Sequence, residues 1–257
     1  MQKAVKITCL VASVALCLVA MASAQTSVTL TGVSGQVYDG IYVSPYYATV
    51  GGVANTPVIC DDFGDDSFLN STWNASVTSF SNINSSNTAW GLAGANTALY
   101  GAVGYLTNLI LSAAPGSTTQ VIDTFALWAV FDPKGVEQYL ASHPVTSGPL
   151  TTAALCSAIF GTSGCTSATA VAGGLLYTAE NSGYTAGQFN LVVLTPDLTG
   201  TSKLCTAESG NCVAQEFISI SVPEGGTAAA YLLLAGFCCL GAIFYRSRQG
   251  VSVRTVA

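Results

Sequence analysis

The chain has 257 residues, of which 50% are hydrophobic and only 8% are charged, a composition that excludes an intrinsically disordered chain. All thirteen acidic residues except Glu224 lie between residues 25 and 221, where the only Lys or Arg residues are Lys134 and Lys203. Because phosphate groups are bound by clustered Lys and Arg, this acidic balance excludes nucleic-acid binding.

The first 24 residues predict a secretory signal peptide. Two lysines precede an apolar run over residues 7–22, and the small residues ASA at 22–24 provide a cleavage site. We therefore expect an exported protein whose mature chain begins at Gln25, with one domain over residues 25–221.

Several stretches between residues 28 and 80 predict β-strands. β-Branched and aromatic residues alternate or cluster in VTLTGV, GQVYDGIYVSPYYATV, PVICDDF and WNASVTSF. Gly, Pro and Asn separate these stretches, which favours antiparallel β-hairpins at the N-terminus of the domain.

Within this region the sequence CDDFGDD holds four aspartates, Asp61, Asp62, Asp65 and Asp66. Their carboxylates are ligands that calcium prefers, but they lack the alternate-residue spacing of an EF-hand loop. We therefore interpret them as solvated acids of a turn, and a calcium site stays open.

Residues 87–113 change to a helical period, since Leu99, Val103, Leu106 and Ile110 fall on one helical face. The segment is rich in Ala and Gly, which permits close packing against a neighbouring element.

A second helix is predicted to begin after Ser117, because an N-cap serine followed three residues later by Gln120 forms a capping box. It ends at Phe131, where Asp132 and a proline follow. The apolar stripe of this helix comprises Val121, Phe125 and Trp128.

Shorter helices are predicted at residues 136–142, 150–159 and 167–181, the last ended by Gly183. The sequences QFNLVVLT and AQEFISIS then return to strand. The order of strands, central Ala/Gly-rich helices and C-terminal strands predicts an α+β domain in which the terminal strands can join the first sheet.

The expected exported domain holds five cysteines, Cys60, Cys156, Cys165, Cys205 and Cys212. Short loops close easily in an oxidising compartment, so we expect two local disulfides, Cys156–Cys165 and Cys205–Cys212, and one unpaired thiol; other pairings stay open. No CxxC spacing occurs and His143 is the only histidine, which excludes a structural zinc site.

No catalytic motif is present. A Ser-His-Asp triad would have to use His143, and neither a GxSxG elbow nor a GxxxxGK phosphate loop occurs. We therefore expect no enzyme, no cofactor and no metal. An enzyme that uses paired carboxylates on a matrix polymer is the remaining catalytic alternative.

The C-terminus predicts a membrane anchor. Residues 228–245 carry no charge and are long enough to cross a bilayer, so we predict a single transmembrane helix over residues 227–245. Arg246 and Arg248 follow it, and the positive-inside rule makes residues 246–257 a basic cytoplasmic tail.

A short motif stands before this helix, the sequence VPEGG formed by Val222, Pro223, Glu224, Gly225 and Gly226. The order of motif, apolar helix and basic tip resembles the sorting signal of PEP-CTERM exported bacterial proteins, with Gly225 in place of the family's second proline. The resemblance implies processing by an exosortase-like peptidase of the inner membrane. It also implies delivery to the cell surface or to an extracellular polysaccharide matrix.

The sequences VICDDF and TFALWAVFDP resemble, more distantly, the thioester domains of bacterial surface adhesins. That resemblance implies a bond between Cys60 and a glutamine four residues before Trp128. Thr124 occupies this position here, and Gln120 lies one helical turn earlier. Cys60 is therefore a candidate reactive thiol, with an ordinary buried thiol as the alternative.

Together these features predict a non-enzymatic surface or matrix protein that is exported, held by its terminal helix and then sorted. The alternative is an adhesin or glycan-binding module. It would use four aromatic residues of the early hairpins, Tyr38, Tyr42, Tyr46 and Tyr47. The same alternation of aromatic residues is also typical of the core of a sheet.

Overall fold

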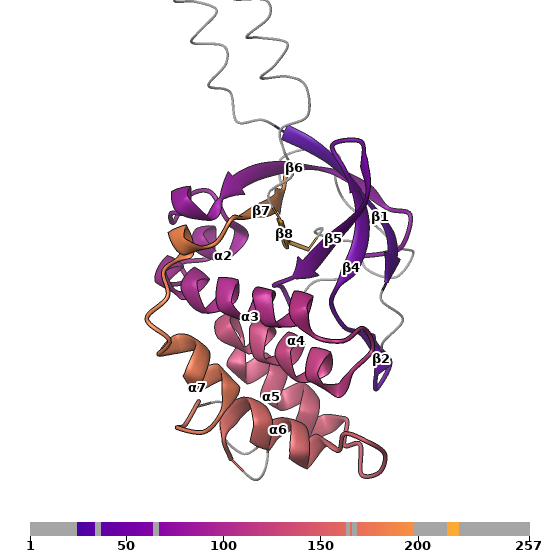
Figure 1. The fold of residues 1–257 in the computed structure, drawn as a ribbon, viewed down its shortest axis with the longest axis vertical. Helices are drawn as coiled ribbons and strands as arrows, with labels where there is room; N and C mark the ends of the chain where they lie inside the picture. Colours follow the sequence, from indigo (N-terminus) through magenta and orange to yellow (C-terminus); the bar gives the residue numbers. More distant parts are fainter. Residues whose placement is uncertain are drawn as a thin grey trace, which may run out of the picture. The chain divides into compact units, whose positions relative to one another are not determined.

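The computed structural model describes residues 25–33, 37–63, 67–162, 165, 169–197 and 215–220. In these ranges a β-barrel packs against a group of helices (Figure 1). The segments predicted as signal peptide, sorting motif, transmembrane helix and basic tail lie outside the described residues: 1–24, 222–226, 227–245 and 246–257.

Antiparallel strands close the barrel in the order β1-β4-β5-β8-β7-β6, with β6 paired back to β1. A short hairpin of two further strands, β2 (Val37–Tyr38) and β3 (Ile41–Tyr42), precedes β4. The barrel strands are β1 (Gln25–Val33), β4 (Tyr46–Val50), β5 (Val53–Cys60), β6 (Thr72–Ser79), β7 (Leu191–Pro196) and β8 (Phe217–Ile220).

The predicted fold class, an α+β domain of N-terminal hairpins, central helices and C-terminal strands followed by a transmembrane helix, is wrong. The sheet closes into a barrel because β8 pairs with both β5 and β7 while β6 returns to β1. Pairings such as Val58 with Ser219 join distant parts of the chain, so tertiary packing decides them and a local pattern does not. Across the described ranges, no helix combines the length and apolar character that crossing a bilayer requires.

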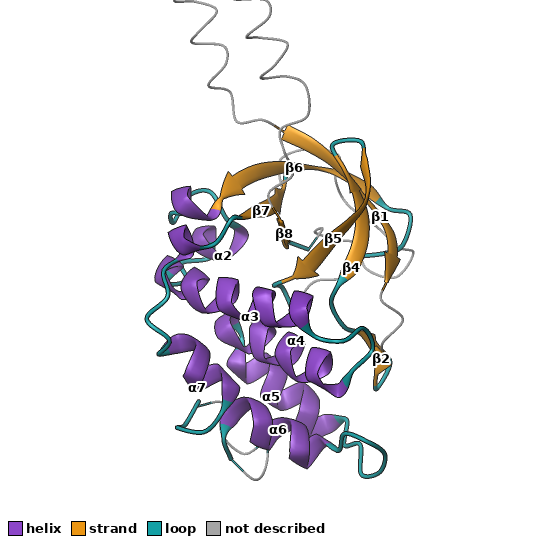
Figure 2. Cartoon of the chain, viewed as in Figure 1, coloured by secondary structure: helices purple, strands orange, loops and turns teal. Residues whose placement is uncertain are grey.

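The helices gather on one side of the barrel (Figure 2). The predicted second helix is confirmed as α4 (Thr118–Phe131), where the Ser117 side chain accepts a hydrogen bond from the Gln120 N–H at 3.3 Å. The other helices are α2 (Ala89–Leu92), α3 (Tyr100–Ser112), α5 (Pro133–Ser142), α6 (Thr152–Phe160) and α7 (Leu175–Glu180), with 3-10 turns η1 (Phe80–Asn82), η2 (Thr97–Leu99) and η3 (Ala186–Gln188).

Two helices differ from their predicted extents because glycines adopt left-handed backbone conformations. The helix predicted over residues 87–113 is divided, since Gly94 has φ 86° just after α2, and the chain becomes helical again at η2 and α3. The helix predicted over residues 167–181 begins only at Leu175, because Gly173 has φ 103°.

Alternation along β8 separates two apolar cores. Phe217 lies inside the barrel, where its ring centroid is 5.7 Å from that of Trp73 and 6.0 Å from that of Tyr46. The next residue, Ile218, belongs to the core formed with the helices, together with Ile59 and other outward-facing strand residues. Where β5, β7 and β8 meet the helices, the barrel wall therefore packs on the barrel interior with one face and on the helical core with the other.

Glycines on α3 allow another segment to lie directly against the helix. A Cβ at Gly101 would overlap the carbonyl oxygen of Tyr184, and one at Gly104 would overlap the ring of Phe189. The close packing expected from the Ala/Gly-rich composition is thus confirmed for this helix.

Cys156 on α6 and Cys165 form a disulfide with Cα atoms 5.4 Å apart, which confirms one of the two predicted pairs. Cys60 is free and buried. The other predicted pair, Cys205 with Cys212, lies outside the described residues.

Candidate functional site

Two acidic residues meet at one end of the barrel, where β5 stops and β8 begins. The backbone N–H of Asp61 donates to the carbonyl oxygen of Glu216 at 3.5 Å, directly after the ladder pair of Cys60 and Phe217. Neither Asp61 nor Glu216 has exposed surface. The antiparallel register therefore places two carboxyl groups inside the protein, between the barrel and the helices.

The Glu216 carboxylate accepts three hydrogen bonds, each 2.6 Å long, from three different elements. Tyr100 Oη on α3 donates to Oε1, while Thr195 Oγ1 on β7 and the backbone N–H of Ala89 on α2 donate to Oε2. Burial raises the pKa of Glu216, and these donors oppose that rise. Because hydrogen bonds to a charged acceptor are strong, Glu216 ties the barrel to the helices.

Asp61 has the opposite environment. Within the described structure, neither of its carboxylate oxygens has a hydrogen-bond partner. Burial raises the pKa of Asp61 well above its ordinary value of 3.8, and the negative charges of Glu216 and Asp62 raise it further. A protonated Asp61 can donate to Glu216, whereas an ionised Asp61 would be a second buried charge beside it. We therefore assign one shared proton to the pair.

The interpretation of the aspartates as solvated turn acids is wrong for Asp61 and Asp62, which are 0% and 9% exposed. The Trp90 indole N–H on α2 donates to the Asp61 carbonyl at 3.1 Å, so a helix covers this turn. Asp65 and Asp66 lie outside the described residues. Among the described residues, those of this turn included, there is no group of three or more His, Cys, Asp or Glu that could hold a metal ion.

Cys60, at the end of β5, is fully buried next to this pair. Its Sγ donates to the carbonyl of Asp62 at 2.9 Å, and its own carbonyl accepts from the Trp128 indole at 3.0 Å. Burial raises the pKa of the Cys60 thiol well above its ordinary value, and the charges of Asp62 and Asp61 add to the rise. The structure thus holds this sulfur as a protonated thiol away from solvent.

The Gln120 side chain, considered from the sequence as a partner of Cys60, is engaged elsewhere. Its Nε2 donates to the carbonyl of Ile110 at 3.3 Å, and its Oε1 accepts from the N–H of Gly116 at 2.8 Å. Gln120 therefore joins the start of α4 to the end of α3.

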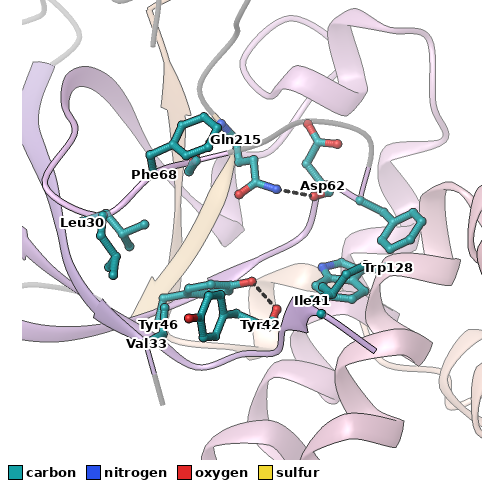
Figure 3. Close-up of a pocket in the computed structure, with 13 residues that line it drawn as sticks. Leu30, Val33, Ile41, Tyr42, Tyr46, Asp62, Phe68, Trp128 and Gln215 are labelled. Carbon is teal, nitrogen blue, oxygen red and sulfur yellow. Dashed lines mark hydrogen bonds between the residues drawn. The ribbon is translucent and has the colours of Figure 1, made fainter. Parts of the chain in front are cut away.

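A pocket of about 450 Å³ opens at this same end of the barrel (Figure 3). It lies among the ends of β1, β4 and β5, the hairpin of β2 and β3, and α4. Its aromatic lining consists of Tyr42, Tyr46, Phe63, Phe68 and Trp128, and its polar lining includes Asp62, Ser67 and Gln215.

Hydrogen bonds hold the polar side of the pocket together. Gln215 Nε2 donates to the carbonyl of Asp62 at 3.0 Å, the acceptor that Cys60 also uses, and the Gln215 N–H donates to Ser67 Oγ at 3.2 Å. Since Asp62 and Gln215 are the chain neighbours of Asp61 and Glu216, the buried acid pair lies directly behind this wall.

The structure divides the four tyrosines that the sequence proposed as one aromatic binding set. Tyr42 and Tyr46 line the pocket, and Tyr46 Oη donates to the Tyr42 carbonyl at 2.6 Å. Tyr38 is buried and its ring centroid is 5.4 Å from that of Phe125 in the helical core. Tyr47 points the other way along β4 and is 36% exposed. Two of the four therefore belong to the site.

Sequence reasoning missed Gln215 and Glu216. The sequence AQEFISIS was interpreted only as a strand, although two polar residues directly before its apolar run were a signal of a special environment. Tyr100 and Thr195, which bind Glu216, carry no local signal, because each looks like an ordinary helix or strand residue.

Comparisons of the chain with known protein families, with curated proteins and with solved structures found no match. The geometry of this end of the barrel is suited to binding. Asp61 and Glu216 have no surface that a substrate could reach, whereas the neighbouring pocket is open and offers aromatic rings beside polar groups.

Proposed function

We propose that this chain is a non-enzymatic protein of the cell surface or extracellular matrix, exported and carrying a C-terminal sorting signal. The observation that carries the proposal is the order of three parts in the sequence: the VPEGG motif at 222–226, the uncharged segment 228–245, and Arg246 with Arg248. An exosortase-like peptidase of the inner membrane reads this order and processes the chain near the motif.

The disulfide between Cys156 and Cys165 supports export, because disulfides form and persist in oxidising compartments outside the cytoplasm. The acidic balance of residues 25–221 supports the same proposal, since such a surface stays soluble and repels anionic lipid headgroups.

Intact mass spectrometry of cytoplasmic, membrane, cell-surface and released fractions tests the sorting proposal. We expect the released chain to begin at Gln25 and to lack the segment that follows the motif. A Glu224→Lys variant should accumulate uncut in the membrane fraction, whereas Lys134→Gln, an exposed change on α5, should be sorted normally. Full-length chain with both termini intact, dissolved in the cytoplasm, would overturn the proposal.

The pocket at the barrel mouth favours a second role for the same protein, that of an adhesin or glycan-binding module. The supporting observation is the exposed Tyr42 ring at the rim of a preformed aromatic pocket. Co-sedimentation of the purified full chain with isolated matrix polysaccharide tests this role. We expect binding that Tyr42→Ala weakens, and a chain that stays entirely in the supernatant would contradict it.

A further inference from the structure

We propose that the pocket at the barrel mouth is a binding site for an uncharged saccharide, an inference that rests on the adhesin role proposed above. Aromatic rings from separate segments of the chain surround the opening and a hydrogen-bonded polar wall faces it; among the described residues that line it there is no Lys, Arg or His. Sugars need this combination, because their ring faces present C–H groups and their edges present hydroxyls.

The aromatic side chains supply the apolar contacts. Tyr42, on β3, is 46% exposed, and Phe68, in the segment before β6, is 39% exposed, so both rings are available at the rim. Figure 3 shows Tyr42 together with Tyr46, and Phe68 on another side of the opening. A ring that enters between them is contacted on more than one face, which aromatic side chains do at low cost in conformational entropy.

The deeper rings are already held in place before any ligand binds. Tyr46 is fixed by the hydrogen bond to the Tyr42 carbonyl and by the edge-on contact with Phe217. Trp128 is fixed by its bond to the Cys60 carbonyl and by the Phe63 ring 5.1 Å away, centroid to centroid. Because these side chains lose little freedom on binding, the pocket is preorganised.

The polar wall gives the hydroxyl groups of a sugar their partners. Gln215, Asp62 and Ser67 come from three places in the chain and are linked by the two bonds of Gln215. The backbone carbonyl of Asp62, the amide of Gln215 and the hydroxyl of Ser67 together both donate and accept hydrogen bonds, as a hydroxyl ligand requires.

Charge selects against acidic sugars. Among the described lining residues, Asp62 is the only Asp or Glu, and no Lys, Arg or His is present. The carboxylate of a uronic acid would find no cation among the described lining residues, in a domain where acids far outnumber Lys and Arg, so charge disfavours acidic sugars.

Isothermal titration calorimetry on the purified full chain tests the inference. The probes are neutral hexose and N-acetylhexosamine oligosaccharides, matched in length with uronic-acid oligosaccharides. We expect binding of at least one neutral series and none of the acidic series, and Tyr42→Ala should weaken the binding about tenfold or more. Tyr42→Phe, which keeps the ring, should recover part of the affinity.

Tyr177→Ala is the matched control, since this tyrosine is 39% exposed on α7 and does not line the pocket. It should leave the affinity at the wild-type value, and circular dichroism should show all variants folded. Three results would overturn the inference: tighter binding of the acidic series, equal effects of Tyr42→Ala and Tyr177→Ala, or no heat with any neutral probe. Co-sedimentation with matrix polysaccharide tests the adhesin role separately: a chain that co-sediments but gives no heat with any neutral probe overturns this inference and leaves the adhesin role standing.

Discussion

Asp61 and Glu216 are backbone partners across the end of two barrel strands, and both are completely buried. One of them, Glu216, has three donors, while neither oxygen of Asp61 has a partner in the described structure. This asymmetry favours an ionised Glu216 next to a protonated Asp61. We therefore expect the free energy of unfolding to change with pH as this pair binds or releases one proton.

Asp61→Asn should remove that dependence. The folded pKa of Asp61 is raised well above 3.8, so the folded state binds a proton that the unfolded state has released, and stability falls as pH rises through this window. One proton corresponds to a slope of at most about 1.4 kcal/mol per pH unit. The asparagine amide can donate to Glu216 at every pH, so urea unfolding should give a flatter profile and a more stable protein at pH 8.

Asp123→Asn provides the comparison. Burial raises the pKa of Asp123 to about 6. Ionisation of Asp123 therefore lowers the free energy of unfolding between about pH 4 and pH 6, and this loss does not grow at higher pH. This variant should change the profile only in the acidic range. Parallel profiles of wild type and Asp61→Asn above pH 6 would show that the pair does not share a proton.

Tyr100→Phe should destabilise the fold, because it deletes the donor to Glu216 Oε1 and leaves that oxygen buried without its bond. Hydrogen bonds to charged groups contribute about 1.5–3 kcal/mol, and we expect a loss in the free energy of unfolding of that size. Chemical denaturation measures it. The control is Tyr177→Phe, at an exposed position of α7, which should change stability by no more than about 0.5 kcal/mol. Equal stabilities of the two variants would refute the role given to Glu216.

Cys60 should react with alkylating reagents only when the protein unfolds. Its thiol is fully buried, bonded to the Asp62 carbonyl, and raised in pKa, so the reactive thiolate is scarce and covered. Labelling with iodoacetamide in increasing urea, followed by peptide mass mapping, should show modification of Cys60 that follows the unfolding curve. Rapid labelling of the folded chain would contradict this. A Cys60 peptide joined to a glutamine with loss of ammonia would identify a thioester instead.

Gly101→Ala should destabilise the protein although alanine is the better helix former. The added methyl group overlaps the Tyr184 carbonyl, a backbone atom that cannot turn aside, and overpacking of this kind costs about 1–3 kcal/mol. Gly187→Ala is the control, because the nearest atom to its Cβ is 3.9 Å away. Thermal melts should separate the two substitutions clearly. Similar melting temperatures would mean that the segment after α7 does not pack against α3 as described.

Helix α4 shows how much of the fold could be predicted from the sequence. Its first turn is capped by Ser117, Asp132 caps the next helix, and the side chains of its predicted stripe are buried. Each of these effects acts over one or two turns, so the residues that cause it are neighbours in the sequence. The disulfide of Cys156 with Cys165 was predictable for the same reason, since a short loop closes easily.

The candidate site was much less predictable. Cys60, Tyr42 and Tyr46 were named from the sequence, but Glu216 and Gln215 were not, and Asp61 was expected in solvent. Asp61 becomes buried only because β8 inserts between β5 and β7 and because α2 covers the turn with Trp90. The residues next to Asp61 in the sequence indicate neither this strand pairing nor the contact with Trp90.

The sequence by itself determined the helices and strands whose caps, periods and short loops are local, and it determined the acidic balance of residues 25–221. Only the tertiary structure decided that the strands close into a barrel, that two carboxyl groups share one buried space, and that rings from β3, β4 and α4 meet at one mouth. The physical reason is the range of the forces involved. Hydrogen bonds of a turn or cap are satisfied within a few residues. Burial and strand pairing instead depend on which segment, distant in the sequence, packs against a residue or pairs with its strand.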